Sequence, residues 1–479
     1  MITFLVGLLI LLAGYLTYSK YVEKQFDPDG RPTPAYAIND GVDFIPLNIR
    51  RNQMIQLLSI AGMGPIVGAI QGILFGPIAF LLIPVGCILM GAVHDYFAGM
   101  ISMRNNGMQV TGLIEKYLGK TWYYIFLVII AVLMLLVAVV FVYTSGDLLA
   151  SKFFNVTDFS LNNKIILYIY GSIILYYLLS TMFPIDKIIG NVYPILGFIL
   201  IIGTFLLLAG FFVKGVSLQE INFAHLNMHP KKFYLIPMFF MTISCGLLSG
   251  FHSTQATVIA RTVQHEKEGR KVFYAMMCVE SFIAMVWAAA AMTTYNLNVV
   301  PENFIGQVPA IRIMTEYFVP SYLAFIVIIA VVVLPITTGD TSLRALRLTL
   351  SDAFKVSQAK PSGRFLISIP VFCLVIFLLY IVKTQPDGFA LIWRYFMFVN
   401  QLMVLPTFFY ATIYLYKNKK NYFITLLPGL LFVYIDMLFI LNAKIGFNLS
   451  YGLSSIIALI FVVITIFYIS KKLRGAKWI

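Results

Sequence analysis

Apolar residues fill most of the chain in long runs, which short polar segments separate. The runs are about 20 residues long, the length at which a helix crosses a membrane. Only helices and closed barrels satisfy their backbone polar groups in hydrocarbon, and uninterrupted apolar runs of this length are typical of helices. The pattern therefore predicts an all-α polytopic membrane protein. Its helices, about 13 in number, are expected at 2–19, 53–75, 77–103, 121–147, 163–182, 188–213, 234–260, 271–296, 320–350, 364–383, 390–416, 422–441 and 450–470.

Composition and charge agree with this fold class and add an orientation. The chain is 60% hydrophobic and 11% charged, with a net charge of +14. About 25 of the Lys and Arg residues fall in alternate loops, against about 8 in the others. This bias predicts a cytoplasmic C-terminus and an N-terminus outside. The positive charge is therefore explained by topology, and no nucleic acid partner is expected.

The cysteines give no sign of a metal centre. All four lie within apolar runs and at no spacing typical of metal ligands or of a disulfide framework. Small apolar side chains such as free Cys are common in protein cores. We therefore expect no bound metal, and no cofactor beyond a coupling ion, from Cys87, Cys245, Cys278 and Cys373.

The helices divide into two similar halves. With the first helix and the last two set aside, ten remain, five in each half. Because five is odd, the second half enters the membrane upside down, which is the inverted repeat of many secondary transporters. The expected organisation is a leading helix and cytoplasmic loop at 1–52, repeats at 53–213 and 214–416, and two trailing helices with a basic tail at 417–479.

A short phrase recurs on the third helix of each half. It is TSGD in the first half, ending at Asp147, and TTGD in the second, ending at Asp340, and each ends an apolar run. An acid in hydrocarbon marks a functional site by default. Asp340 is the stronger candidate, while Asp147 is interpreted as its structural echo at the outer face. With backbone carbonyls near Gly62, the hydroxyls of Thr337 and Thr338 are expected to form a cation site.

The first helix of each half is interrupted by glycines, in LLSIAGMGPIVG from Leu57 and in MTISCGLLSG from Met241. Such breaks either unwind around a ligand or allow close helix packing. Unwinding is favoured because both helices break at matching positions. The half-helices that follow would present positive dipole ends to an anionic group. The predicted substrate-binding residues are Gly62, Met63, Gly64, Gly250, His252, Ser253, Gln255, Asn400 and Gln401.

Three further polar residues lie on the second helices of the two halves. His94 and Asp95 are adjacent in the first half, and Glu280 occupies the corresponding helix of the second. A histidine beside an acid is able to relay protons, because its charge changes near neutral pH. These side chains favour proton coupling, whereas Thr337 and Thr338 favour sodium, and the sequence leaves both open.

Several long segments resemble the carbon starvation protein A family of bacterial transporters. They are DGVDFIPL from Asp40, AGMGPIVGAIQGILFGP from Ala61, GAVHDYFAGM from Gly91, SCGLLSGFHSTQATVIAR from Ser244, EKEGRKVFY from Glu266, WAAAAM from Trp287, ITTGDTSLRALRLTLSD from Ile336 and WRYFMFVNQ from Trp393.

The resemblance implies a secondary transporter in the bacterial inner membrane. It implies that an ion gradient drives the import of short peptides by alternating access, or alternatively of pyruvate or a similar monocarboxylate. It also implies the LeuT-like five-plus-five fold of the amino acid–polyamine–cation transporters. The expected partners are thus a small-molecule substrate and membrane lipid.

Two rival functions remain. An intramembrane aspartyl protease would need Asp147 and Asp340 within hydrogen-bonding reach of each other, so that one shared proton activates water. The repeat instead predicts that they lie well apart and that the protein is not an enzyme. A channel or nutrient sensor would show flux independent of a counter-gradient, or no flux.

Overall fold

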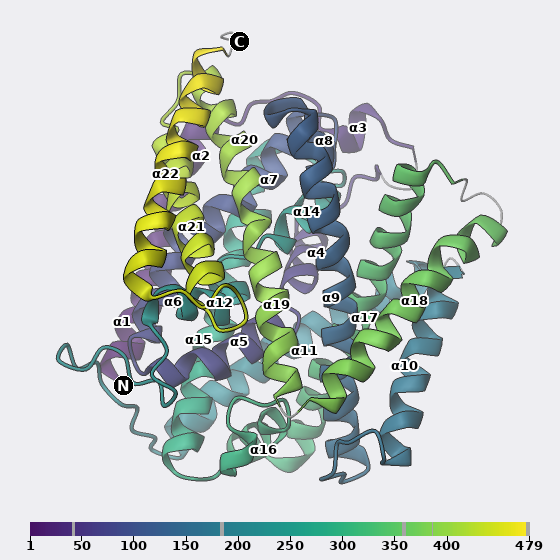
Figure 1. The fold of residues 1–479 in the computed structure, drawn as a ribbon, viewed down its shortest axis with the longest axis vertical. Helices are drawn as coiled ribbons and strands as arrows, with labels where there is room; N and C mark the ends of the chain where they lie inside the picture. Colours follow the sequence, from purple (N-terminus) through teal and green to yellow (C-terminus); the bar gives the residue numbers. More distant parts are fainter. Residues whose placement is uncertain (41–43, 183–185, 357–360, 386, 476–479) are drawn as a thin grey trace. The chain divides into compact units, whose positions relative to one another are not determined.

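The computed structural model describes residues 1–40, 44–182, 186–356, 361–385 and 387–475, and this part of the chain is helical (Figure 1). The chain forms two compact units. Unit 1 comprises Met1–Phe126, Leu218–Ala288 and Asn400–Ile479, and unit 2 comprises Leu127–Ser217 and Ala289–Val399.

Unit 1 is built from many short helices and two long ones near the C-terminal end of the chain. In Figure 1 these two, α21 and α22, lie side by side. The helices of unit 1 are α1 (Ile2–Leu16), α2 (Tyr18–Phe26), α3 (Pro34–Ala37), α4 (Ile49–Ile60), α5 (Gly64–Gly72), α6 (Ala79–Gly86), α7 (Ala92–Arg104), α8 (Val110–Leu118), α12 (Leu235–Thr242), α13 (Ser244–Leu247), α14 (Phe251–Ile259), α20 (Val404–Lys417), α21 (Phe423–Asn442) and α22 (Tyr451–Arg474).

Unit 2 consists of longer helices. They are α10 (Lys164–Met182), α11 (Asp186–Val213), α16 (Pro309–Phe318), α17 (Ser321–Phe354) and α18 (Pro361–Thr384). Three helices begin in one unit and end in the other, namely α9 (Lys120–Phe153), α15 (Ala275–Asn296) and α19 (Gly388–Leu402).

The described helices confirm a polytopic membrane protein. Ten of them are long and apolar enough to cross a membrane, or eleven when α4 and α5 count as one bent span. Two predicted segments fall short of this test: the apolar part of α10, Lys164–Ser180, is short, and 234–260 is divided among α12, α13 and α14. The number of about 13 is therefore not confirmed.

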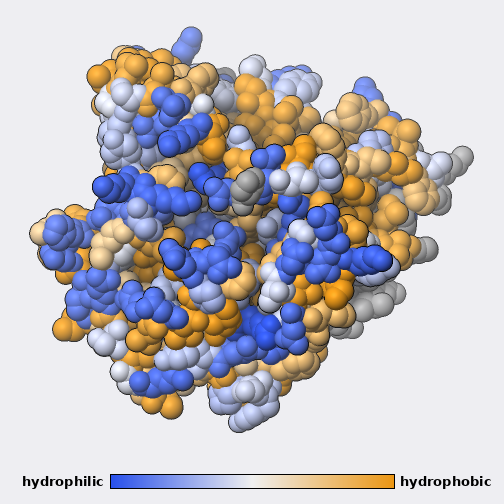
Figure 2. Space-filling model, turned by 60° about the horizontal axis from the view of Figure 1, so that its bottom comes forward, coloured by the Kyte–Doolittle hydropathy of each residue, from blue (hydrophilic) through white to orange (hydrophobic). Residues whose placement is uncertain are grey.

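Many apolar side chains are exposed on the helices. In Figure 2, hydrophobic residues lie beside and between the hydrophilic ones on the face that comes forward. α22 exposes apolar side chains along its length, including Phe467 (72%) and Ile456 (60%). Apolar atoms exposed in this number are stable in hydrocarbon but not in water.

The two predicted helix breaks are present. α4 ends at Ile60 and α5 begins at Gly64, with a bend of 49° between them. In the other half the chain leaves helical geometry at Leu248, where φ is −167° and ψ is 129°, and α14 begins at Phe251. Proline favours the first turn of a helix because it lacks an N–H, so Pro65 fits the start of α5.

The end of α9 corrects the sequence prediction. α9 continues to Phe153, beyond the predicted end at 147, so TSGD lies inside this helix and not at its end. α17 continues to Phe354, and TTGD lies inside it, in agreement with the predicted range 320–350. The hydroxyls of Thr144 and Thr337 bond back to carbonyls three residues earlier, at Phe141 and Leu334. Side chains that bond to their own helix in this way do not interrupt it.

The two broken helices pack against each other at very short range. A Cβ atom added at Gly64 would lie 2.3 Å from the Sγ atom of Cys245 on α13, so only a glycine allows this approach. A Cβ atom at Gly250 would lie 2.2 Å from the carbonyl oxygen of Asn400. Close packing and unwinding, the two alternatives left open by the sequence, therefore occur together.

We predict that Gly64→Ala destabilises the protein by about 1–3 kcal/mol, because the added methyl group overpacks the contact with Cys245. The matched control is Gly171→Ala in α10, where no atom lies within 4 Å of the added Cβ, so stability should stay equal or rise slightly. The measurement is thermal unfolding of purified protein in detergent. Equal shifts of the midpoint in both variants would contradict the packing argument.

Candidate functional site

The main polar cluster of unit 1 joins residues from three predicted spans. The Nδ1 atom of His94 lies 2.9 Å from Oδ1 of Asp95, and Nδ1 of His252 lies 3.0 Å from Oδ2 of the same carboxylate. On the far side of its ring, Nε2 of His252 lies 3.5 Å from Oε2 of Glu280. All four side chains are fully buried. The structure thus brings together the residues that the sequence singled out separately, with His252 between the two acids.

The hydrogen bonds define what this cluster does chemically. Asp95 as a carboxylate only accepts, so both histidines present Nδ1–H to it. This leaves Nε2 of each histidine as a basic nitrogen, and that of His252 is directed towards Glu280. A proton placed on either group would let Glu280 and His252 form a hydrogen bond, with Asp95 on the opposite side of the imidazole.

Two π-helical turns hold the helices of this cluster in place. One, at Cys87–Gly91, separates α6 from α7 shortly before His94, and the other, at Arg270–Tyr274, precedes α15 and Glu280. The hydroxyl of Tyr274 donates to the carbonyl of Ile88, 2.7 Å away, so the two turns are joined directly. Such π-turns inside α-helices frequently occur at functional sites.

The break before α14 is closed by side chains from α19. The Oδ1 atom of Asn400 accepts from the backbone N–H of Phe251 at 2.8 Å, and its Nδ2 atom donates to Ser244 and Ser249. Gln401 donates to the carbonyls of Phe240 and Leu248. These contacts correct one detail of the prediction, because the helix end expected to face an anionic ligand already has an amide oxygen on its first N–H.

The other predicted substrate residues lie at the same two breaks. Met63 is fully buried and forms the N-cap of α5 without a side-chain hydrogen bond to it. The hydroxyl of Ser253 bonds to the carbonyl of Gly250 at 2.7 Å, and Gln255 donates to the hydroxyl of Thr254. Their role in substrate binding stays a prediction.

Sequence analysis missed Gln56, on α4 one turn before the first break. Its carboxamide is fully buried, and neither its oxygen nor its nitrogen has a hydrogen-bond partner in the described part of the chain. A buried amide without partners costs about 1–3 kcal/mol, so such a group calls for an explanation. A carboxamide side chain inside an apolar span is unusual, so the sequence alone could have indicated Gln56 as a candidate functional residue.

In unit 2, Asp147 belongs to an ion pair that the sequence did not reveal. Nζ of Lys383 on α18 lies 2.8 and 3.0 Å from the two carboxylate oxygens, and the hydroxyl of Tyr170 also donates to Oδ1. The side chains of Lys383 and Asp147 are only 3% and 4% exposed. Asp147 is therefore a partner in a buried salt bridge and more than a structural echo of Asp340. The sequence feature that could have indicated Lys383 is its position as the one basic residue in the last turn of an apolar helix.

Asp340 has different neighbours. The hydroxyl of Ser180 on α10 donates to its carboxylate, and Arg344 lies 3.8 Å away one turn along α17. Tyr170 and Ser180 are ten residues apart on α10, which is about 15 Å along a helix. The two acids therefore contact well-separated points of one helix, as the repeat predicts and a protease dyad does not.

The predicted cation site at Thr337 and Thr338 is not tested. Both hydroxyls donate to the carbonyl of Leu334 in their own helix, at 2.8 and 3.0 Å, and their oxygens keep acceptor capacity. They belong to unit 2 and Gly62 to unit 1. Across the described residues, no three His, Cys, Asp or Glu side chains are grouped to hold a metal ion.

Comparison with known proteins identifies the family. The model of the carbon starvation protein CstA family matches residues 1–175 and 142–312. The chain belongs to this family. An uncharacterized membrane protein of Haemophilus influenzae is 36% identical over 341 residues, which cover 62% of this chain and 92% of the relative.

Two further CstA-family relatives carry functional names. The peptide transporter CstA of Campylobacter jejuni is 39% identical over 114 residues, covering 23% of this chain and 16% of the relative. The pyruvate/proton symporter BtsT of Escherichia coli is 27% identical over 340 residues, covering 59% of this chain and 47% of the relative. The matches thus span less than half of these longer proteins.

A solved structure shares the fold of this CstA-family chain. A mutant of the manganese transporter of Eremococcus coleocola superposes with a TM-score of 0.57 over 90% of this chain and 95% of the other, at 13% identity. At this identity the similarity shows the fold alone. It agrees with the all-helical architecture described above.

We predict that breaking the buried pair in unit 2 is costly, whereas removing it whole is not. Asp147→Leu and Lys383→Met should each lower the unfolding free energy by about 3–5 kcal/mol, because each leaves a buried charge unpaired. The double variant should lose much less than the sum. As a control, Lys420→Met, which removes an exposed pair with Asp27, should leave the unfolding midpoint nearly unchanged.

The measurement is a double-mutant cycle from thermal unfolding in one detergent. Strictly additive single effects would show that Asp147 and Lys383 do not stabilise each other, and would contradict the ion pair.

Proposed function

We propose that the protein is an ion-gradient-driven secondary transporter that imports short peptides across the bacterial inner membrane by alternating access. Its family, its membrane-spanning helices and the names of its relatives support transport of a small molecule. The peptide as substrate is supported by relatives that are named peptide transporters.

Protons are the proposed coupling ion, and the Asp95–His252–Glu280 chain is the observation that carries this proposal. Its charge depends on how many protons it holds: with neutral histidines and both acids ionised it carries two negative charges. Each added proton reduces the cost of burying that charge in hydrocarbon. A conformational change that alters access to Glu280 would therefore bind a proton on one side and release it on the other.

The proposed substrate site lies beside the two breaks in unit 1. Freed backbone groups at Gly62–Gly64 and Leu248–Gly250, with the unpartnered amide of Gln56, offer polar contacts in an otherwise apolar interior. Irregular backbone at membrane depth is tolerated where it is buried in protein or lines a cavity. Gly250 and His252 are close in sequence, so a substrate at this break would sit beside the proton-binding chain.

The proposed architecture keeps about 13 helices in a five-plus-five inverted repeat, with the N-terminus outside. Its support is the way the chain divides into units. Unit 1 contains most of the first two helices of each predicted half, and unit 2 the third and fourth of each. The first four pairs of corresponding helices thus share a unit, as expected if the halves arose by duplication, whereas the fifth helices, 188–213 and 390–416, lie mostly in different units.

A second candidate is import of pyruvate or another small monocarboxylate. The observation that favours it is the 27% identity with the pyruvate/proton symporter BtsT, over more of this chain than the match to the Campylobacter jejuni peptide transporter. The positive dipole end of α5, at Met63–Pro65, suits a carboxylate of either substrate.

We expect purified protein in proteoliposomes to accumulate labelled dialanine when a pH gradient, acidic on the outer side, is imposed, and not when a sodium gradient is imposed alone. Labelled pyruvate serves as the competing substrate in the same vesicles. Uptake driven only by sodium would contradict proton coupling and favour Thr337 and Thr338. Downhill flux unaffected by either gradient would indicate a channel.

We expect Glu280→Gln to abolish uptake driven by the pH gradient and to preserve exchange of internal for external substrate. Glutamine keeps the volume and polarity of Glu280 but binds no proton, so the loaded carrier still moves while net coupled transport stops. Ser281→Ala, which alters the adjacent residue, is the control and should retain both activities. Loss of exchange together with uptake in Glu280→Gln would indicate a structural role instead.

A further inference from the structure

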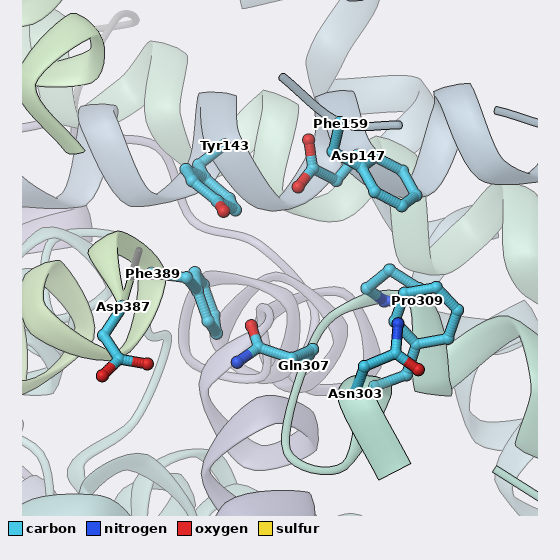
Figure 3. A pocket seen from close by; sticks show the side chains of 9 residues that line it. Tyr143, Asp147, Phe159, Asn303, Gln307, Pro309, Asp387 and Phe389 are labelled. Atoms are coloured by element: carbon cyan, nitrogen blue, oxygen red, sulfur yellow. The ribbon is translucent and has the colours of Figure 1, made fainter. Parts of the chain in front are cut away.

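Unit 1 has an open groove between α2, the π-helical turn at Cys87–Gly91 and the start of α21, away from the proposed transport site. Its volume is about 490 Å³, and sites for small ligands typically measure about 300–1,000 Å³. A smaller pocket in unit 2 has no such free space for a charged ligand, because Lys383 already occupies Asp147 and Asp387 lies at its other end (Figure 3). The groove in unit 1 is lined by Tyr18, Tyr21, Leu89, Met90, Asn421, Phe423, Ile424, Leu427, Pro428 and Leu431.

Most of this lining is apolar, and much of it is exposed. The exposed fraction is 44% for Leu89, 50% for Phe423 and 60% for Leu427. Contiguous exposed apolar side chains mark a surface that contacts a membrane or a partner. From Phe423 to Leu431 α21 rises by about 12 Å, and one leaflet of the hydrocarbon core is about 15 Å thick. The apolar part of the groove therefore has the length of an acyl chain within one leaflet.

One end of the groove is polar. Nδ2 of Asn421 donates to the hydroxyl of Tyr21 at 2.6 Å, and the backbone N–H of Asn421 donates to Oε1 of Gln25 at 3.0 Å. The hydroxyl of Tyr21 accepts this bond and keeps its own proton for a ligand. Tyrosines such as Tyr18 and Tyr21, each with an apolar ring and a polar tip, are enriched where the membrane meets water. This end is therefore suited to the level of lipid headgroups.

The polar end is also positively charged. The single acid within four residues of Tyr18, Tyr21 or Asn421 is Glu23, and it is paired with Arg270 at 2.8 Å. Lys24 is exposed and lies three residues after Tyr21, so the two side chains are neighbours on the surface of α2. The N-terminus of α21 adds the positive end of a helix dipole. The lysines within the same four-residue range are Lys20, Lys24, Lys417, Lys419 and Lys420.

We propose that this groove binds an anionic phospholipid, with one acyl chain along Leu89, Leu427 and Leu431 and the phosphate beside Tyr21 and Lys24. The chain covers the exposed apolar side chains, while the phosphate accepts hydrogen bonds from the hydroxyl and the ammonium group. The sequence predicts membrane lipid as a partner in general terms. The groove gives that partner a position and a headgroup charge.

The test is native mass spectrometry of the full-length protein, released from nanodiscs that contain equal amounts of phosphatidylglycerol and phosphatidylethanolamine with the same acyl chains. The first headgroup is anionic and the second has no net charge. A lysine beside an anionic headgroup contributes about fivefold in affinity. We expect one retained lipid per protein, with phosphatidylglycerol favoured at least about fivefold.

Two matched pairs of variants locate the lipid. Lys24→Gln should reduce the preference for phosphatidylglycerol by about fivefold, whereas Lys444→Gln, which makes the same change of charge beyond the opposite end of α21, should not. Leu427→Trp should reduce retention of both lipids, because the larger ring fills the groove. Leu459→Trp on α22, where Leu459 is 54% exposed and outside the lining, should retain lipid like the unaltered protein.

Equal retention of the two lipids, or equal effects of Lys24→Gln and Lys444→Gln, would overturn the proposal. Loss of the retained lipid on addition of glycerol 3-phosphate would assign the polar end to a soluble phosphate ester instead. A dimer that Leu427→Trp disrupts, without retained lipid, would assign the groove to a second copy of this chain. None of these readouts involves substrate uptake, so their failure leaves the proposed transport function standing.

Discussion

Hydrocarbon does not solvate polar groups, so every backbone amide and every charge inside the membrane must find its partner within the protein. The break between α13 and α14 shows how the chain meets this constraint. Unwinding frees the N–H of Phe251 and the carbonyl of Leu248, and the neighbouring side chains Asn400 and Gln401 bond to them. Two consecutive amides on α19 thereby stabilise an irregular backbone that would otherwise be too costly. Whatever binds at this break must compete with Asn400 for the same N–H.

Ionisable side chains meet the same constraint in two different ways. In unit 2, Asp147 has a full opposite charge from Lys383 at 2.8 Å, which neutralises it in place. In unit 1, two carboxylates share two histidines, and no lysine or arginine is paired with them in the described contacts. A salt bridge is satisfied without any change, whereas Glu280, which faces the basic Nε2 of His252, forms a hydrogen bond to it only with an added proton. The first arrangement suits a fixed structural link and the second suits a group that gains and loses protons.

The sequence was sufficient to locate both helix breaks, as well as His94 and the two acids Asp95 and Glu280, because glycines and ionisable residues inside apolar runs are rare. It did not reveal which groups meet. Lys383 lies 236 residues from Asp147, and a lysine at the end of an apolar helix looks like an ordinary loop charge. The π-turn at Cys87–Gly91 is an apolar segment like its neighbours, so its irregular hydrogen bonding has no compositional signal. Asn400 was predicted as a substrate-binding residue, yet only coordinates show that its oxygen faces the backbone N–H of Phe251 at the break.

The two copies of the hydroxyl-Gly-Asp phrase show how similar sequences acquire different chemistry. Both glycines allow a tyrosine of α10 to approach, since a Cβ atom at Gly146 would meet the ring of Tyr170 at 2.0 Å and one at Gly339 would meet the hydroxyl of Tyr177 at 2.1 Å. Asp147 forms an ion pair with Lys383, whereas Asp340 accepts a hydrogen bond from Ser180 and has Arg344 one turn away. The glycine fixes helix packing in both copies, while the partner of the acid fixes its charge. The two copies therefore share a packing role, while their acids have different partners.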